Sequence, residues 1–335
     1  MLHFLAIDPY FLGELMNNDI MQQSENFHKL SEEVGKVIIG QKETIRCMLL
    51  GVLCDGHLLL EGVPGVAKTT MIKALTRAMG LSFKRIQFTP DLLPSDLVGT
   101  LIYNQKTQDF ETKKGPIFAN LILADEINRA PAKVQAALLE AMQEHQVTIG
   151  STTFALDKPF LVFATQNPLE QEGTYRLPEA QVDRFMFKII IDYPSKKEEK
   201  EILLNHQEVD LIKPVIDKET ILAAQKTVRD IYCDDKIVDY IVTLVTATRT
   251  PELFGLADIK KYIVYGVSPR ATLALSAASR AFAFLQKRTF VTPDDVKAVA
   301  VQILRHRLVL SVDAEAENIS PDMLIKKILL SIPTP

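Results

Sequence analysis

The stretch at residues 58–70, LLLEGVPGVAKTT, constrains the fold of this chain more than any other part of its sequence. An apolar run enters a loop that contains Gly62 and Gly65, and Lys68 and Thr69 follow at the start of a predicted helix. A buried strand, a glycine-bearing loop and a helix in this order are typical of a phosphate-binding P-loop. The stretch therefore predicts a polyphosphate site at the end of a buried strand.

The residue types in this loop suit a polyphosphate. Gly62 and Gly65 lack Cβ atoms, so backbone N–H groups can approach phosphates closely, and the following helix adds the positive end of its dipole. The spacing predicts that Lys68 reaches the β- and γ-phosphates and that the Thr69 hydroxyl ligates Mg²⁺. The residues predicted to contact the nucleotide here are Gly62, Val63, Pro64, Gly65, Val66, Ala67, Lys68, Thr69 and Thr70.

The loop departs from the G-x-x-x-x-G-K-[ST] pattern at one position, where Ala67 replaces the second glycine. If this position has helical backbone angles, a methyl group is tolerated. If it has a positive φ, the backbone is strained. The sequence leaves both conformations open.

Composition narrows the class of protein. The chain has 335 residues, of which 47% are hydrophobic, and its net charge is −4 with a pI near 5.9, which argues against a dedicated DNA-binding protein. Cys47, Cys54 and Cys233 show no C-x-x-C spacing and are predicted to be reduced. Neither a signal peptide nor a transmembrane segment is predicted, so a cytoplasmic location is expected.

The first part of the chain alternates short apolar runs with helical patterns. Besides the P-loop strand, strands are predicted at residues 83–88, 121–125, 160–165 and 187–191. This alternation predicts an α/β fold with a parallel five-stranded sheet covered by helices on both faces.

Two insertions in this part are predicted to be β-hairpins. The first, residues 101–119, has its tip near residues 105–109, and the second, residues 146–160, turns at Gly150 and Ser151. They are either surface decoration or functional elements.

After Pro194 the pattern becomes helical. Thr292 and Asp295 form a predicted capping box at the start of one of these helices. The change in pattern predicts a domain boundary at residue 194, followed by a small all-helical domain (195–335). Its helices are expected at residues 196–206, 218–230, 235–249, 269–285, 293–307 and 323–330.

Paired carboxylates, Asp125 and Glu126, follow the predicted strand at 121–125. If this strand lies near the P-loop strand, Asp125 enters the Mg²⁺ ligand shell and Glu126 acts as the base toward the attacking water. Two carboxylates at the end of an isolated strand would otherwise be a solvated turn.

Three further polar residues are candidates for catalysis. Asn167 follows the strand at 160–165, where it could bind the attacking water or a γ-phosphate oxygen, although Asn-Pro alone is an ordinary turn. Arg184 and Arg270 are suited to spreading phosphoryl charge, but either could instead form a structural ion pair.

The motifs GVPGVAKT, LILADEINRAP, ATQNP, LPEAQVDRF and GVSPRA occur in this order from about residue 33 onward. Together they resemble the AAA+ ATPases and most closely the MoxR family. The resemblance implies a nucleotide-binding core at residues 33–194 and leaves residues 1–32 outside it as an N-terminal helical extension. The resemblance implies a P-loop AAA+ αβα sandwich followed by a small helical lid, with ATP and Mg²⁺ as cofactors and ATP bound between the two parts.

The resemblance also implies roles for individual residues. Asn167 corresponds to the first sensor, Arg184 to an arginine finger that acts on a neighbouring subunit, and Arg270 to the lid sensor of the γ-phosphate. The segment lining the adenine pocket corresponds to Ile38, Ile39 and Gly40. The two hairpins correspond to the helix-2 insert and the pre-sensor-1 hairpin, which move with nucleotide state.

At the level of the whole protein, the resemblance implies a ring-shaped homo-oligomer, such as a hexamer, that hydrolyses ATP. Such rings remodel or mature a protein client or load it with metal, often with a partner that carries a von Willebrand factor A domain. Two other functions remain open: a DNA-directed motor, and a nucleotide-gated scaffold with little turnover. The acidic pI argues against the motor, and Glu126 with Arg184 argues against the scaffold.

Overall fold

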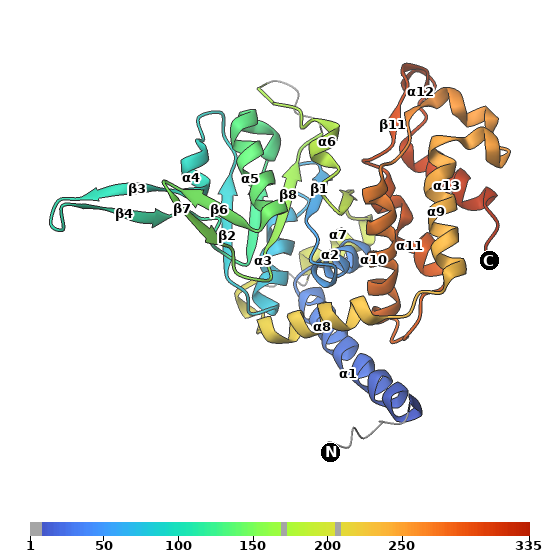
Figure 1. Cartoon of the computed structure of the whole chain (residues 1–335), viewed down its shortest axis with the longest axis horizontal. Coiled ribbons are helices and arrows are strands. Elements are labelled where there is room, and N and C mark those ends of the chain that lie inside the picture. The colour runs from blue at the N-terminus through green and yellow to red at the C-terminus, as the bar shows by residue number, and fades with distance from the viewer. Residues whose placement is uncertain (1–8, 169–172, 205–208) are drawn as a thin grey trace, which may run out of the picture.

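The computed structural model describes residues 9–168, 173–204 and 209–335, and its centre is a five-stranded parallel sheet (Figure 1). The strand order is β2-β5-β8-β1-β9, so the predicted parallel α/β architecture is confirmed. The predicted bounds hold for β5 and β9 and differ by one residue for β2 and β8. The strands are β1 (Leu58–Gly62), β2 (Phe83–Gln87), β5 (Leu121–Asp125), β8 (Leu161–Gln166) and β9 (Phe187–Ile191).

Burial explains why the central strands are apolar throughout. Leu58 and Leu60 face one hydrophobic cluster, and Leu59 faces the other, so both sides of β1 are covered. The first cluster includes α1 (Pro9–Gly35), α2 (Lys42–Leu53) and α3 (Lys68–Ala78), and the second includes α4 (Pro94–Val98) and α5 (Ala132–Glu144). β2 forms an edge of the sheet, and its exposed side carries polar residues.

Both predicted hairpins are present. β3 (Gly99–Asn104) and β4 (Asp109–Lys114) pair antiparallel and project away from the body of the molecule (Figure 1), with residues 105–108 at the tip. β6 (Gln146–Ile149) and β7 (Thr152–Ala155) form the second hairpin, which turns at Gly150 with φ +62.

The C-terminal part is mainly helical, and the predicted bounds of α8, α9 and α10 are confirmed. The predicted capping box of Thr292 and Asp295 is also confirmed. α11 ends three residues before the predicted end, and the predicted end of α7 lies outside the described residues. The helices are α7 (Lys196–Leu204), α8 (Lys218–Asp230), α9 (Asp235–Arg249), α10 (Pro269–Leu285), α11 (Pro293–Leu304), α12 (Val312–Ala316) and α13 (Pro321–Ser331).

The expectation of helices only after Pro194 is wrong in one respect. This part also contains a two-stranded antiparallel sheet, β10 (Ile263–Tyr265) with β11 (Val309–Leu310). Strands this short do not establish a period of two that sequence reasoning can detect. Other short elements were also not predicted: α6 (Glu179–Val182), η1 (Ile127–Arg129), η2 (Val209–Leu211), η3 (Pro251–Phe254) and η4 (Ala257–Tyr262).

Helix α1, for which the sequence indicated no role, packs against both parts of the molecule. It contacts α2 and α3 on the sheet side and α10 on the lid side. Its buried Phe27 meets Phe284 of α10 edge to face, with ring centroids 5.8 Å apart. Among the described helices, none combines the length and apolarity that crossing a bilayer requires.

Candidate active site

The P-loop joins the carboxyl end of β1 to the start of α3. The Nζ atom of Lys68 donates to the Gly62 carbonyl and, at 3.4 Å, to the carbonyl of Gln166 at the end of β8. The ammonium group therefore lies across the mouth of the loop, between the ends of two adjacent strands. Thr69 lies half-buried in the first turn of α3.

The backbone explains why glycine occupies both positions of the loop, Gly62 and Gly65. A Cβ atom on Gly62 would lie 2.6 Å from the Ile191 carbonyl oxygen, so β1 and β9 could not approach as they do. Gly65 has φ +86, and a Cβ there would meet nothing within 4 Å. An exposed loop with backbone in this region and open space beside it fits a phosphate group.

Ala67 has φ 59 and ψ 23, so it lies in the left-handed region. Of the two conformations that the sequence left open, the structure therefore has the one with positive φ. A non-glycine residue in this region costs roughly 1–2 kcal/mol. The strained residue is the N-cap of α3 and lies directly before Lys68.

A cavity of about 190 Å³ adjoins the loop. Its lining is mostly apolar and includes Ile38 and Ile39. The other lining residues are Val37, Gln41, Gly65, Val66, Ala67, Thr70, Pro194 and Ile202. Gly40 lies beside it with φ +86. A Cβ on Gly40 would lie 2.4 Å from a carboxylate oxygen of Glu198, so α7 packs closely over this turn.

Asp125, at the end of β5, is only 7% exposed, and both of its oxygens are engaged. Oδ1 accepts from the Thr165 hydroxyl at 2.6 Å, and Oδ2 accepts from Nε and Nη2 of Arg85 at 2.9 and 2.5 Å. These contacts hold the carboxylate at the carboxyl ends of the parallel strands, on the side of the sheet where the P-loop lies.

Glu126 has φ 56 and ψ 51, a left-handed conformation that is uncommon for a glutamate. Its backbone N–H donates to the Thr165 hydroxyl at 2.9 Å, and its Oε2 accepts from the Gln87 amide at 2.8 Å. Arg129 Nε lies 3.2 Å from the same oxygen. The second carboxylate therefore has its own partners, Gln87 and Arg129, which Asp125 does not share.

Asn167 follows the last residue of β8 and is 6% exposed. Because β5, β8 and β1 are parallel neighbours, their carboxyl ends meet at one sheet edge. The structure therefore brings together four of the predicted site residues: Lys68, Asp125, Glu126 and Asn167.

Arg184 and Arg270 lie on the opposite side of the sheet from the P-loop, near the amino-terminal ends of β1 and β9. Met186, which leads into β9, donates its N–H to the carbonyl of His57, the residue before β1, at 2.8 Å. Arg184 precedes this contact by two residues, whereas the P-loop follows the far end of β1. Five strand residues span roughly 16 Å, so these arginines are separated from the P-loop of their own chain.

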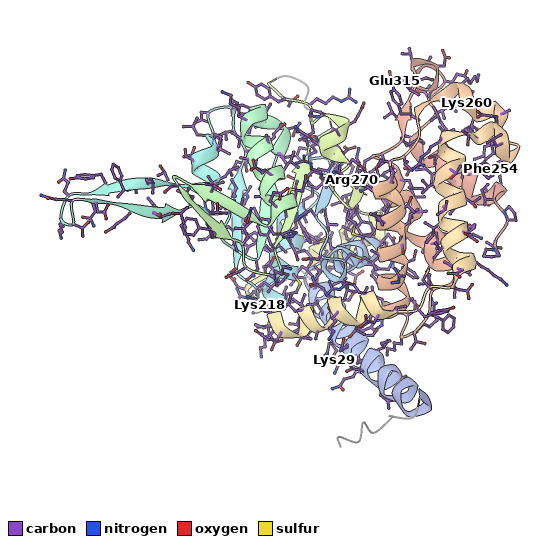
Figure 2. All side chains as sticks on the ribbon, in the orientation of Figure 1. Lys29, Lys218, Phe254, Lys260, Arg270 and Glu315 are labelled. Carbon is purple, nitrogen blue, oxygen red and sulfur yellow. The ribbon has the colours of Figure 1, made fainter. Side chains whose placement is uncertain are left out.

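The two arginines share one environment. They line a cavity of about 260 Å³, to which His57, Met142 and Leu273 also contribute. Arg270 Nη1 lies 3.5 Å from Asp183 Oδ2, so Arg270 does form an ion pair, with the residue that precedes Arg184. Figure 2 shows Arg270 where α10 meets the sheet-containing part of the molecule.

Sequence reasoning missed several residues that hold this site together. Arg85 and Gln87 were detectable in principle, because alternating polar residues in a strand mark one face, here the exposed side of the edge strand β2. Thr165 lies in an apolar run, and Asp183 and Arg307 are far apart in sequence, so no local pattern marks them.

Comparison with known proteins agrees with this arrangement. Residues 57–187 match the family described as "ATPase family associated with various cellular activities (AAA)", and residues 256–328 match the AAA lid domain.

Whole proteins are also similar to the chain. Chaperone MoxR1 of Mycobacterium tuberculosis is 49% identical over 304 residues, which cover 90% of this chain and 81% of that protein. Protein MoxR of Paracoccus denitrificans is 33% identical, with 96% and 99% covered. The crystal structure of a putative ATPase from Cytophaga hutchinsonii superposes with a TM-score of 0.89 at 49% identity and covers 95% of this chain and 97% of that one. The P-loop, the paired carboxylates, the lid and these relatives show that the chain is an ATPase that belongs to the MoxR family of AAA+ proteins.

Proposed function

We propose that this ATPase works as a ring-shaped homo-oligomer, such as a hexamer, in which Arg184 and Arg270 of one subunit complete the ATP site of the next. The observation that carries this proposal is the placement of the two arginines at the sheet edge away from their own P-loop. Arginine is suited to the charge of a transferring phosphoryl group, and that group is out of reach within one chain.

The residues at the P-loop edge have distinct roles in this proposal. Lys68 and the loop backbone bind the ATP phosphates, and Thr69 and Asp125 hold Mg²⁺, which neutralises charge on the phosphate oxygens when bound. Glu126 takes a proton from the attacking water, and Asn167 orients that water. The apolar pocket beside Ile38 and Ile39 receives the adenine ring.

The ring would use ATP hydrolysis to remodel or mature a protein client, or to insert a metal cofactor into it. One relative that is named a chaperone, MoxR1, and the exposed apolar residues of the β3–β4 hairpin support a protein client. These residues are Leu101, Ile102, Tyr103 and Phe110. A partner with a von Willebrand factor A domain and a cytoplasmic location belong to the same proposal.

The hairpin gives little support to a DNA-directed motor. Lys114, one of its basic residues, lies over the rings of Phe118 and Phe154, at 4.7 and 5.2 Å from their centroids. Its charge is therefore used within the protein, at the base of the hairpin rather than at the tip.

Two single variants test the chemistry. Lys68→Ala should abolish ATP binding. Glu126→Gln should retain binding and lose turnover by roughly 10²–10⁴-fold, the usual effect of removing a general base. Binding is measured with a fluorescent ATP analogue and turnover by phosphate release. A Glu126→Gln protein that hydrolyses ATP like the parent would contradict the assignment of the base.

Mixing variants tests the shared site. Arg184→Ala and Lys68→Ala proteins should each be inactive, and their mixture should regain activity, because some interfaces then pair an intact P-loop with an intact arginine. Subunit exchange is verified by fluorescence transfer between labelled proteins. Activity no greater than the sum of the separate proteins, with exchange verified, rejects the shared site.

A further inference from the structure

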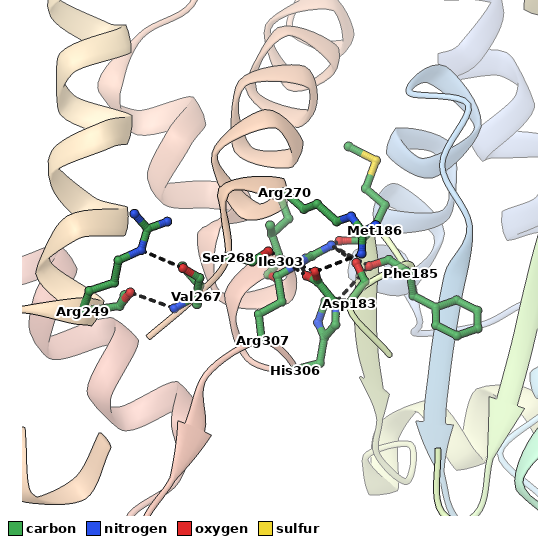
Figure 3. A network of polar contacts seen from close by, with 11 residues as sticks. Asp183, Phe185, Met186, Arg249, Val267, Ser268, Arg270, Ile303, His306 and Arg307 are labelled. Carbon is green, nitrogen blue, oxygen red and sulfur yellow. Dashed lines mark hydrogen bonds and ion pairs between the residues drawn. The ribbon is translucent and has the colours of Figure 1, made fainter. Parts of the chain in front are cut away.

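The residues on either side of the predicted finger Arg184 are both bound by a second, buried arginine, Arg307, and Figure 3 shows this arginine with Asp183 and Phe185. The side chain of Arg307 is 3% exposed. Its Nη2 donates to the carbonyls of Asp183 at 3.1 Å and Phe185 at 2.7 Å, and its Nη1 donates to that of Met186 at 3.1 Å. Three carbonyls of residues 183–186 are therefore fixed by one planar guanidinium group.

The carboxylate of Asp183 joins the same guanidinium to the lid sensor. Oδ1 accepts from Arg307 Nε at 2.7 Å, Oδ2 accepts from the Ser268 hydroxyl at 3.0 Å, and Arg270 Nη1 lies 3.5 Å from Oδ2. One carboxylate thus contacts the two residues that flank the start of α10 and the residue that holds the finger segment.

The residue before Ser268, Val267, is hydrogen-bonded to the end of α9. Arg249, at the end of α9, donates from Nε to the Val267 carbonyl at 2.9 Å, and the Thr248 hydroxyl accepts from the Val267 N–H at 3.1 Å. Two hydrogen bonds thus hold the turn that precedes Ser268 and Arg270, and Figure 3 shows Arg249 and Val267 in this turn.

Charge explains why the cluster depends on Asp183. Burial lowers the pKa of Arg307, the Asp183 carboxylate raises it, and the charge of Arg270 lowers it further. Without the carboxylate, Arg270 and Arg307 would be neighbouring cations with no counter-charge between them. Arg184, in contrast, has a buried Nε without a hydrogen-bond partner in the described part of the chain, and it lines the open cavity.

We propose that Asp183 and Arg307 are positioning residues that set the geometry of both arginines offered to the neighbouring ATP site. Arg307 fixes the backbone of Arg184, and Asp183 fixes Arg270 relative to it, so that the two cations approach the neighbouring γ-phosphate as one unit. This inference rests on the shared site proposed above. It adds that the lid of a subunit is attached to its own finger segment.

Asp183→Asn tests this inference, because it keeps the shape of the side chain and removes the charge. ATP affinity should stay unchanged, since the P-loop lies at the other sheet edge, and turnover should fall by about 10²-fold, the effect of a displacement near 1 Å. The matched control is Asp322→Asn, which removes the carboxylate partner of another partly buried arginine by breaking the 2.6 Å ion pair between Asp322 of α13 and Arg305, the residue that follows α11. The control should retain turnover.

Complementation separates a positioning role from general damage. Asp183→Asn mixed with Lys68→Ala should regain activity, because the Lys68 variant contributes an intact arginine pair. Asp183→Asn mixed with Arg184→Ala should not regain it, because no interface then has a correctly placed finger. A protein that is merely misfolded would complement neither.

The outcomes are distinguishable from those of the shared site itself. If Arg184→Ala and Lys68→Ala fail to complement, the shared site is rejected. If they complement but Asp183→Asn with Lys68→Ala does not, or if Asp183→Asn retains full turnover, the positioning role is rejected. Should Asp183→Asn fail to fold, Ser268→Ala decides: a smaller loss of turnover with the same complementation pattern supports the role, and unchanged turnover overturns it.

Discussion

Arg85 donates two hydrogen bonds to the proposed magnesium ligand Asp125, from Nε at 2.9 Å and from Nη2 at 2.5 Å, both to Oδ2. Arg85 is 47% exposed and lies on the edge strand, whereas Asp125 is nearly buried. The arginine and a cation must therefore compete for the same carboxylate oxygen, or share it. We therefore expect Arg85 to influence the metal requirement of the proposed site.

Replacing Arg85 should lower the magnesium requirement. A half-exposed ion pair contributes up to about 1 kcal/mol, so Arg85→Ala should lower the Mg²⁺ concentration at half-saturation by up to about fivefold. The measurement is Mg²⁺-dependent binding of a fluorescent ATP analogue. Lys84→Ala, on the neighbouring residue of β2, is the control and should change nothing. An unchanged or higher requirement in Arg85→Ala would show that the arginine does not compete with the metal.

Gly40 should be intolerant of a side chain. Its φ of +86 strains any L-residue, and a Cβ would lie 2.4 Å from the Glu198 carboxylate. In Gly40→Ala the turn is expected to relax and move Ile38 and Ile39 out of the adenine pocket, which should weaken ATP binding about tenfold for a cost near 1.4 kcal/mol.

The control for this variant is Gly35→Ala, because a Cβ on Gly35 meets nothing within 4 Å. Both proteins are compared by equilibrium titration with ATP. Equal affinities would place the adenine ring elsewhere.

Ala67→Gly should stabilise the protein against unfolding. Glycine removes the steric cost of φ 59, so the free energy of unfolding should rise by about 1 kcal/mol. Ala74→Gly, in the middle of the same helix, should have the opposite sign, because glycine lowers helix stability there by about 1 kcal/mol. Denaturant unfolding measures both. Destabilisation by Ala67→Gly would mean that the loop has no strain to release.

Stability should fall in mild acid because His57 is buried in its neutral form. Burial lowers the pKa of His57 to about 4, against a hydrogen bond to the Met142 carbonyl that raises it. Between pH 4 and about 6.5 the unfolded chain binds more protons at this residue than the folded chain. The free energy of unfolding should therefore drop by up to about 1.4 kcal/mol per pH unit as the pH is lowered through this window.

The variant His57→Asn removes this titration. Its unfolding free energy should start lower, because Nδ1 also accepts the Val162 N–H at 3.1 Å, but it should vary less steeply with pH. Unfolding by denaturant at several pH values gives the two slopes. Equal slopes would assign the acid sensitivity to other groups, such as His306, whose pKa is also lowered by burial.

The sequence predicts the sheet and the P-loop edge well because both depend on local patterns. The apolar run that ends in Asp125 favours a buried strand. Lys68 directly follows the P-loop, so its position near the phosphate site follows from the loop itself. The order of motifs also predicts the lid. Local patterns do not give the position of Arg270, because that depends on how α8 carries the chain from the core toward the lid.

The contacts that hold the site were beyond sequence reasoning for a related reason. Asp183 and Arg307 are separated by 124 residues, and each is ordinary in its own segment. Arg85 binds Asp125 because β2 is paired with β5 in a specific register, with Gln87 opposite Asp125. Long-range pairing of this kind is a property of the packed molecule rather than of any window of the chain.

Helix α10 is held at both ends, by Asp183 at its start and by α1 at its end. At that end the Leu285 carbonyl contacts His28 Nε2 at 2.8 Å, and Lys287, just beyond the helix, pairs with Glu25 at 2.6 Å. Its 17 residues span roughly 25 Å. Because both ends of α10 are bound, we expect a displacement at its start to shift the whole helix along its axis instead of tilting it. In the ring proposed above, we therefore expect ATP hydrolysis at a shared site to displace α1 of the subunit that supplies Arg184 and Arg270 to that site.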